Sequence, residues 1–209
     1  MAMHFAPRLS LIRADQLVAA PWKNGGGVTR EIAAEPPGAS LDTFAWRVSV
    51  ADVARPGPFS RFPGVDRTLV LLSGAGMTLV DEDGARQVLA APLDRLAFAG
   101  ETPLAAELAD GPTRDFNLMT RRAAMSGRVS VLGDGGAIAS SAPTLLLFCA
   151  CGVPGVAIDG AEAVTLGALD TLRIDASADA GAGRITGTVR GEGALLCIEL
   201  TPKTAAAAA

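Results

Sequence analysis

The stretch that decides the fold is Thr68–Gly76 (TLVLLSGAG), because a similar stretch, Thr144–Gly152 (TLLLFCACG), follows 76 residues later. The register then continues without a gap, so that Asp83-Gly84-Ala85 aligns with Asp159-Gly160-Ala161. Self-similarity at a fixed spacing is the mark of a repeated structural unit. We therefore predict two copies of one supersecondary unit in this chain.

Each copy predicts a succession of short strands. The Asp-Gly pairs stand between apolar runs of strand length, where glycine adopts the positive φ of a hairpin turn at little cost. Leu93–Leu96 (LDRL) and Leu169–Leu172 (LDTL) each lead through a tight turn into a further strand. Frequent turns at about ten-residue spacing are typical of an all-β sandwich or barrel. Helical patterns are few and short, at residues 13–20 and 121–125.

The region between the copies predicts a boundary between two lobes. Residues 123–143 are rich in Gly, Ser and Ala. We therefore expect an N-terminal lobe of residues 1–122 and a C-terminal lobe of residues 123–204, joined in one compact protein. The alanine run 205–209 has no apolar face to dock, so a disordered tail is expected there.

The composition excludes several classes of function. The chain has 18 Lys and Arg against 22 Asp and Glu, which provides no basic surface for a nucleic-acid backbone. Its apolar runs are shorter than the roughly 20 residues of a membrane span, and no signal-peptide stretch opens it. We expect a cytoplasmic protein that binds neither nucleic acid nor membranes.

Histidine and cysteine usage limits the chemistry further. The single histidine, His4, leaves a catalytic triad or a site of several His ligands without its components. Cys149, Cys151 and Cys197 lie in apolar stretches and read as buried reduced thiols, with a soft-metal site on the first two as the alternative. We expect no metal and no other cofactor.

The least random segment is Pro21–Ile32 (PWKNGGGVTREI). Three consecutive glycines indicate unusual backbone angles or the close approach of another group. They are compatible with a tight turn between strands, and also with a backbone that points successive N–H groups at an anion. The candidate binding residues of this segment are Trp22, Lys23, Asn24, Gly25, Gly26 and Gly27.

Three further segments alternate between apolar and polar side chains, as strands with two different faces do: residues 28–32, 44–50 and 115–121. Polar strand faces usually meet solvent, but in a small barrel they can line a ligand cavity. On the cavity interpretation, Trp46 is a packing wall or lid. The polar candidates are Thr29, Glu31, Arg47, Ser49, Asp115 and Asn117.

A loop with two phenylalanines and two arginines, residues 57–67, lies between these strands. Long loops with aromatic anchors and charged groups are commonly functional. A guanidinium group matches a carboxylate with two parallel hydrogen bonds. Arg47, Arg61 and Arg67 are therefore the candidates for contact with an anionic ligand.

Four blocks resemble the successive signatures of the HutD/Ves family: residues 21–32, 44–51 (FAWRVSVA), 57–67 (GPFSRFPGVDR) and 115–122 (DFNLMTRR). They stand in the family's order, and the resemblance spans about residues 10 to 200. It implies a bicupin fold of two tandem cupin-like antiparallel barrels or sandwiches, often as a homodimer. The usual His-x-His, Glu and distal His ligands of cupins have no counterparts here, which argues against metal-dependent cupin chemistry.

The resemblance also implies an association with bacterial histidine utilisation. We therefore expect a metal-independent protein that binds a small anionic metabolite, such as N-formylglutamate or urocanate, in a regulatory role. The alternatives are a metal-independent hydrolase or isomerase of a histidine-pathway acid, with Glu31 or Asp115 as acid or base beside Lys23, and a purely structural dimer.

Overall fold

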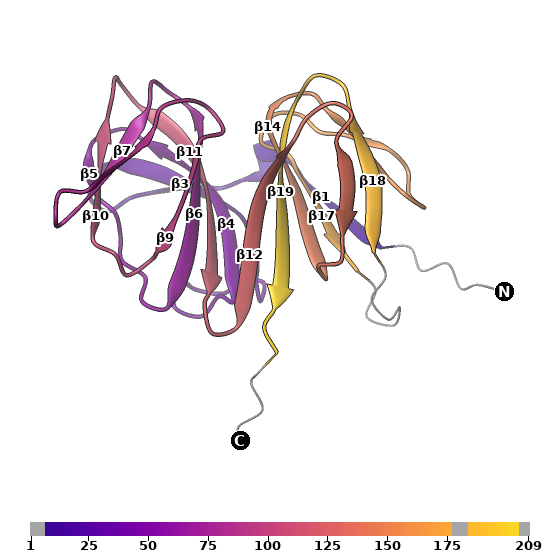
Figure 1. Ribbon diagram of the computed structural model, residues 1–209, viewed down its shortest axis with the longest axis horizontal. Helices are drawn as coiled ribbons and strands as arrows, with labels where there is room; N and C mark the ends of the chain where they lie inside the picture. Colours follow the sequence, from indigo (N-terminus) through magenta and orange to yellow (C-terminus); the bar gives the residue numbers. More distant parts are fainter. Residues whose placement is uncertain (1–6, 177–183, 205–209) are drawn as a thin grey trace. The chain divides into compact units, whose positions relative to one another are not determined.

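The structure, a computed structural model, describes residues 7–176 and 184–204. Regular structure in these ranges consists of antiparallel strands and one short 3-10 helix, η1 (Ala14–Gln16) (Figure 1). The predicted all-β fold with few short helices is thereby confirmed. His4 and the predicted tail at residues 205–209 lie outside the described residues.

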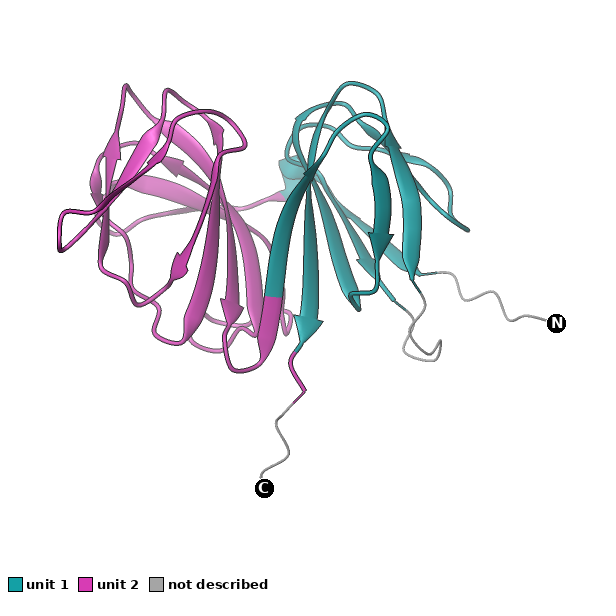
Figure 2. Ribbon diagram, viewed as in Figure 1, with its two compact units in different colours: residues 1–16, 127–202 teal, residues 17–126, 203–209 magenta. Residues whose placement is uncertain are grey.

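The chain forms two compact units, each made from two separate stretches (Figure 2). As far as they are described, unit 1 consists of Met1–Gln16 and Gly127–Pro202, and unit 2 of Leu17–Ser126 and Lys203–Ala209. The sequence places the lobe boundary at residues 122 and 123, close to the observed change. Its N-terminal lobe differs from unit 2 at the start, because β1 (Arg8–Ile12) pairs with a strand of unit 1.

Unit 2 contains a six-stranded and a four-stranded sheet. The six-stranded sheet has the order β2 (Ala19–Pro21), β3 (Gly27–Glu35), β4 (Trp46–Val53), β11 (Thr113–Arg121), β6 (Val65–Ser73) and β9 (Arg95–Ala99). The four-stranded sheet has the order β5 (Gly57–Pro58), β10 (Leu104–Leu108), β7 (Met77–Asp81) and β8 (Arg86–Leu89). Buried apolar residues of both sheets, among them Leu69, Leu71 and Leu79, form one core cluster. The unit is therefore a sandwich of two open sheets.

Unit 1 repeats this plan with a five-stranded and a four-stranded sheet. The first has the order β1, β17 (Thr171–Asp175), β14 (Thr144–Gly152), β19 (Gly193–Pro202) and β12 (Met125–Leu132). The second has the order β13 (Ala137–Ser140), β18 (Ile185–Arg190), β15 (Gly155–Ile158) and β16 (Val164–Thr165). A second core cluster joins its two sheets.

The predicted repeat is confirmed in the backbone. Leu93 and Leu169, which the repeat aligns, have φ angles of 74° and 69°. Positive φ is rare for a residue with a Cβ, so its occurrence at both positions marks one turn structure used twice. In each unit, the aspartate that follows accepts backbone N–H groups of its own turn, Asp94 from Ala90 and Asp170 from Gly167.

The two units differ in the side chain at one equivalent position of their sheets: unit 2 has an aspartate there, and unit 1 has a buried cysteine. Asp115 of β11 lies opposite Leu71, and Cys197 of β19 lies opposite Leu147, the repeat partner of Leu71. Cys197 belongs to the core cluster of unit 1, and burial raises the pKa of its thiol to about 11. At this position, therefore, unit 2 has a carboxyl group where unit 1 has a thiol.

The cysteines are free thiols, as predicted. Cys149 and Cys197 are buried, as predicted. The prediction of burial is wrong for Cys151, which is exposed because a β-bulge between Cys149 and Cys151 shifts the register of β14. A metal site on the first two cysteines is not formed, because within the described ranges no three His, Cys, Asp or Glu side chains come together as ligands.

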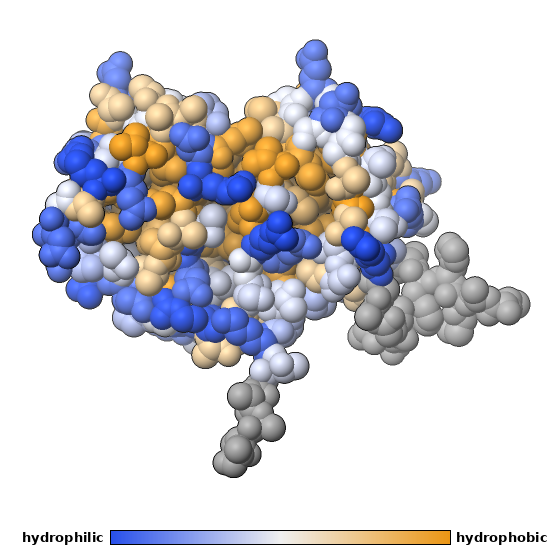
Figure 3. Space-filling model, in the orientation of Figure 1, coloured by the Kyte–Doolittle hydropathy of each residue, from blue (hydrophilic) through white to orange (hydrophobic). Residues whose placement is uncertain are grey.

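The surface mixes polar and apolar residues. On the face that Figure 3 shows, apolar residues gather over part of each unit, and hydrophilic residues lie mainly toward the outer edges. Within residues 7–176 and 184–204, no helix has the length and apolar character that a membrane crossing requires.

Candidate functional site

The inner face of the six-stranded sheet of unit 2 lines a cavity of about 710 Å³. This volume lies in the range of small-molecule sites, which is about 300–1,000 Å³. Side chains from β3, β4, β6 and β11 form its floor, and the loops 39–41 and 58–62 form its rim. The cavity is thus contained within one unit.

The register of the strands arranges the polar side chains of the cavity floor in rows. Thr29, Ala51 and Asp115 are direct neighbours across β3, β4 and β11, and Glu31, Ser49 and Asn117 form the next row. Arg47 and Arg67 follow in a third row, on either side of Met119. Successive rows share a face because every second residue of a strand points to the same side.

Most of the binding residues predicted from the sequence lie together in this cavity. Its lining includes Trp22, Lys23, Asn24, Thr29, Glu31, Arg47, Ser49, Arg67, Asp115 and Asn117. The polar faces of the three alternating strands therefore point to the cavity and not to bulk solvent. Four predicted residues, Trp46 and Gly25 to Gly27, are not among the lining residues.

Trp46 is neither a wall nor a lid of the cavity. It is 2% exposed and lies on the opposite face of β4, since its neighbour Arg47 points to the cavity. Adjacent residues of a strand point to opposite faces, so Trp46 and Arg47 cannot both face the cavity.

The glycines build a turn in which hydrogen bonds occupy the N–H groups of Gly25 and Gly26, so these two groups are not free to bind an anion. The N–H of Gly25 donates to the carbonyl of Trp22, and that of Gly26 donates to Oδ1 of Asn24. Gly25 has a φ of 68°, which favours glycine. The turn orients Trp22, whose indole N–H donates to Oγ1 of Thr29 over 2.7 Å.

Gly27→Ala is expected to destabilise unit 2. A Cβ at Gly27 would lie 2.4 Å from the carbonyl oxygen of Asp52, on the neighbouring strand. Backbone has to move to relieve this overlap, which costs about 1–3 kcal/mol of unfolding free energy. Chemical denaturation measures it, with Gly57→Ala, whose Cβ would meet nothing within 4 Å, as the control. Equal stability of the two variants would contradict this assignment.

Two arginines of the signature blocks serve the structure outside the cavity lining. Arg61, a candidate for anion contact, is exposed, and its Nε donates to the carbonyl of Glu101 over 3.0 Å. Arg121 shares the strand face of Asp115 and Asn117 in the sequence pattern, but its guanidinium group binds backbone carbonyls of two loops. The anion candidates that remain in the cavity are Arg47 and Arg67.

Arg67 is enclosed by aromatic rings. Its guanidinium carbon lies 5.2 Å from the ring centre of Phe59, 5.6 Å from that of Phe62 and 5.0 Å from that of Phe98. Cation–π attraction favours this arrangement. The sequence missed Phe98, because only the pairing of β6 with β9 sets it directly opposite Arg67.

The positive charge of Arg67 lacks a carboxylate partner. The residue is 6% exposed, and in the described part of the chain no carboxylate lies within ion-pair distance of it. One hydrogen bond runs from Nη1 to the carbonyl of Ser60 over 3.3 Å, while Nε is buried without a partner. Burial lowers the pKa of Arg67 to about 10, so the group is still cationic at neutral pH.

Arg47, in contrast, is held by a carboxylate. Its Nε donates to Oε2 of Glu31 over 2.7 Å, and its Nη1 donates to Oγ of Ser49 over 3.2 Å. The Glu31 side chain is 43% exposed, which places this pair where the cavity meets solvent. Of Arg47 and Arg67, Arg67 is therefore the one whose positive charge has no carboxylate partner.

The environments of Asp115 and Asp52 move their pKa values in opposite directions. Asp115 is 2% exposed, and burial raises its pKa to about 7. Asp52 on the adjacent strand accepts hydrogen bonds from Arg114 and Arg30, which lower its pKa. Oδ2 of Asp115 and Oδ1 of Asn117 are buried without a hydrogen-bond partner among the described residues. The floor thus combines an unpaired cation with unsatisfied acceptors.

These residues do not fit a resident metal ion of the cupin kind. Such ions take three or four histidine and carboxylate ligands. The buried floor offers one carboxylate, Asp115, and the guanidinium groups of Arg47 and Arg67 repel a cation. The donor set suits an anion.

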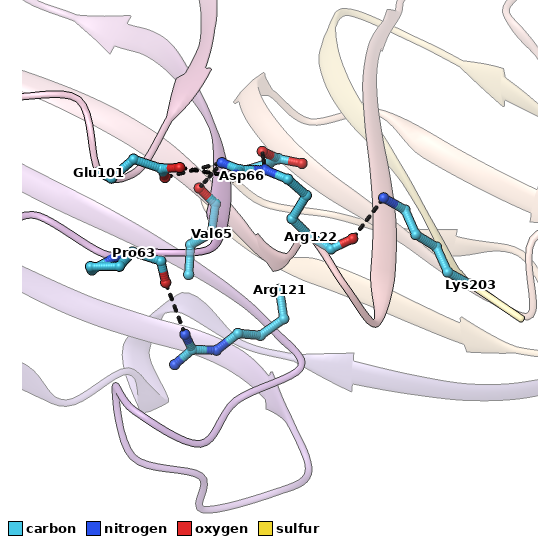
Figure 4. A network of polar contacts seen from close by, with 7 residues as sticks. All are labelled: Pro63, Val65, Asp66, Glu101, Arg121, Arg122 and Lys203. Atoms are coloured by element: carbon cyan, nitrogen blue, oxygen red, sulfur yellow. Dashed lines mark hydrogen bonds and ion pairs between the residues drawn. The ribbon is translucent and has the colours of Figure 1, made fainter. Parts of the chain in front are cut away.

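Arg121 connects the two loops that form the rim. Its Nη2 donates to the carbonyl of Asp42 over 2.6 Å. Its Nη1 donates to the carbonyl of Pro63 over 3.3 Å, a bond that Figure 4 shows. Its guanidinium carbon lies 5.1 Å from the ring centre of Phe44. Residues 39–41 of one loop and Phe62 of the other line the cavity. Arg121 therefore positions the rim without touching the cavity.

Arg121→Ala is expected to loosen both loops. The lost hydrogen bonds lower the unfolding free energy by about 1–3 kcal/mol, and amide hydrogen exchange speeds up at residues 39–44 and 59–64. Arg86→Ala is the control, because Arg86 forms an exposed ion pair with Glu107 in the same unit and neither residue lines the cavity. Unchanged exchange in both loops would contradict a positioning role for Arg121.

Comparison with solved structures defines the class of protein. The chain superposes on a cupin 2 conserved barrel domain protein from Leptotrichia buccalis with a TM-score of 0.57 at 11% identity, over 96% of this chain and 98% of that one. Two cupin-type sandwiches, one of them with a cavity that carries unpaired charge, make this a bicupin protein with a candidate anion site. The sequence matches the HutD family model over residues 14–197, and the chain belongs to the HutD family.

Individual relatives agree with this assignment. An uncharacterised 21.2 kDa protein in the hutC 3' region of Pseudomonas putida is 40% identical, over 80% of this chain and 87% of the relative. The structure of HutD from Pseudomonas fluorescens SBW25 (formate condition) is 34% identical, with a TM-score of 0.82 over 94% of this chain and all of that one. Protein Ves from Cronobacter sakazakii is 46% identical over 53% of this chain and 59% of the relative. The predicted HutD/Ves resemblance is confirmed.

Proposed function

We propose that this protein binds a small anionic metabolite in the cavity of unit 2. The observation that carries the proposal is Arg67, a cation that is buried and without a carboxylate partner. Burial of an unpaired charge is costly, and an anionic ligand offsets that cost by supplying the missing partner. A carboxylate matches the planar donor geometry of the guanidinium group.

The relatives support a biological setting for this proposal. One relative is described by its place in the hutC 3' region, and another is HutD itself. These names support a role in histidine utilisation, in which the protein binds a pathway acid such as N-formylglutamate or urocanate. Binding without turnover would make it a regulator of the pathway, which responds to the level of that acid.

Isothermal titration calorimetry with a panel of small acids tests the proposal. N-formylglutamate, urocanate, glutarate and formate are titrated into the protein, with glutaramide as the uncharged control. We expect saturable binding of at least one acid with micromolar affinity, which corresponds to about −8 kcal/mol, and none of the diamide. Arg47→Ala is expected to weaken binding about tenfold by removing the second cation of the row. Absence of binding by every acid would overturn the proposal.

A second candidate function is a metal-independent enzyme that acts on a histidine-pathway acid. Asp115 favours it, because a pKa of about 7 is suited to a general acid or base at neutral pH. Glu31 is less suited, since Arg47 pairs with it at the solvent boundary. Product analysis by NMR with the acids that bind distinguishes the two functions. Turnover that is lost in Asp115→Asn while binding remains would establish the enzyme.

A further inference from the structure

The floor of the cavity contains two kinds of unsatisfied group at different places. Arg67 lies opposite Met119 of β11, and Asp115 lies four residues earlier on the same strand. Their backbone positions are therefore about 13 Å apart along the strand. Asn117 lies between these two levels. The two side-chain groups are close enough for their charges to influence each other's pKa, so one small ligand can offer different groups to the two ends.

The two ends require opposite hydrogen-bonding partners. A guanidinium group only donates, so the buried Nε of Arg67 needs an acceptor. The free Oδ1 of Asn117 needs a donor, and so does the free Oδ2 of Asp115 when its carboxyl group is ionised. Asp115 and Asn117 are 2% and 9% exposed, and both line the cavity. A plain dicarboxylate would satisfy the first end and bring like charge to the second.

We infer that the ligand is an acid which also carries an N–H or O–H donor, with its carboxylate at Arg67 and its donor at Asp115 and Asn117. This inference rests on the proposed anion binding and specifies the class of ligand. The direction follows from the groups at the two ends, because the reversed ligand would set its donor against the guanidinium group of Arg67 and its carboxylate against Oδ1 of Asn117 and the ionised form of Asp115.

A matched pair of acids tests the inference. Pyrrole-2-acrylic acid and furan-2-acrylic acid have the same charge and nearly the same shape, but the ring N–H of the first is an ether oxygen in the second. We expect the unmodified protein to bind the pyrrole acid at least about tenfold more tightly, because a hydrogen bond to a charged group is gained and an unpaired acceptor is avoided. N-formyl-L-glutamate and its O-formyl ester analogue, 2-formyloxyglutarate, form a second pair with the same expected preference.

A variant at Asp115 tests whether this residue causes the preference for the acid with the N–H group. In Asp115→Leu the preference within each pair is expected to fall to about twofold or less, while the furan acid and the ester analogue keep their affinity. Glu107→Leu is the control, because it removes a carboxylate of the same unit that is exposed and does not line the cavity. The preference in the unmodified protein decides the inference even if Asp115→Leu does not fold.

The outcomes separate the two proposals. Equal binding of the paired acids, or tighter binding of the members without an N–H group, overturns the donor requirement and leaves anion binding in place. A failure of every acid to bind, with or without a donor, removes the proposed function and this inference together. Preference for the N–H acids that persists in Asp115→Leu overturns the role of Asp115.

Discussion

Arg67→Met is expected to lower the affinity for an anionic ligand at least about 100-fold, the largest effect of any single substitution in this protein. Removal of Arg67 takes away the buried cation, and the neighbouring Arg47 is already paired with Glu31. Calorimetry with the acid that binds most tightly measures the loss.

The same substitution is expected to leave the unliganded protein as stable as before or more stable. A buried ion that is replaced by an apolar side chain of similar length often gives a neutral or stabilising change of about 1–4 kcal/mol. Methionine also makes favourable contacts with aromatic rings, and Phe59, Phe62 and Phe98 surround this position. Lost binding together with retained stability marks Arg67 as a residue kept for function.

Arg61→Met is the matched control for Arg67→Met. It removes the same charge from the same unit, but Arg61 is exposed and does not line the cavity. We expect ligand affinity within about twofold of the original, since exposed charges contribute little. A similar loss of binding in both variants would show that overall charge, and not the buried guanidinium group, attracts the anion.

Asp115→Asn is expected to change how stability depends on pH. The pKa of Asp115 is raised from 3.8 to about 7, so the folded protein keeps this proton while the unfolded chain loses it. The folded state therefore loses stability as pH rises from about 4 to 7, by about 4 kcal/mol in total, and Asn does not titrate. Relative to the original protein, Asp115→Asn is expected to be more stable at pH 8 than at pH 4 by up to this amount.

Denaturant unfolding at pH 4, 6 and 8 in the absence of ligand measures this difference. Asp52→Asn is the control with the opposite sign, because hydrogen bonds from Arg114 and Arg30 lower the pKa of Asp52. That substitution is expected to be most harmful at neutral pH and to lose its effect as pH falls through the folded pKa. A stability difference for Asp115→Asn that does not vary with pH would refute the burial of an ionisable carboxyl there.

Much of the fold could be predicted from the sequence, because the patterns that indicate it lie within short stretches of the chain. The repeat of Thr68–Gly76 at Thr144–Gly152 predicted duplicated units, and Leu93 and Leu169 confirm it in their shared positive φ. Alternation along residues 28–32 and 115–121 predicted two-faced strands, and their polar faces do line one cavity. Such patterns are visible because side-chain direction on a strand repeats every two residues.

What the sequence by itself determined is therefore the all-β class, the duplication, the family and the set of polar side chains from which a site is built. The tertiary structure alone decided which of them meet. Pairing of β6 with β9 brings Phe98 to Arg67, strand alternation turns Trp46 away from the cavity, and hydrogen bonds within the turn occupy the N–H groups of Gly25 and Gly26. The physical reason is that burial, ion pairing and cross-strand contact depend on residues far apart in the chain. The same residue types are therefore solvated in one place and left with unpaired charge in another.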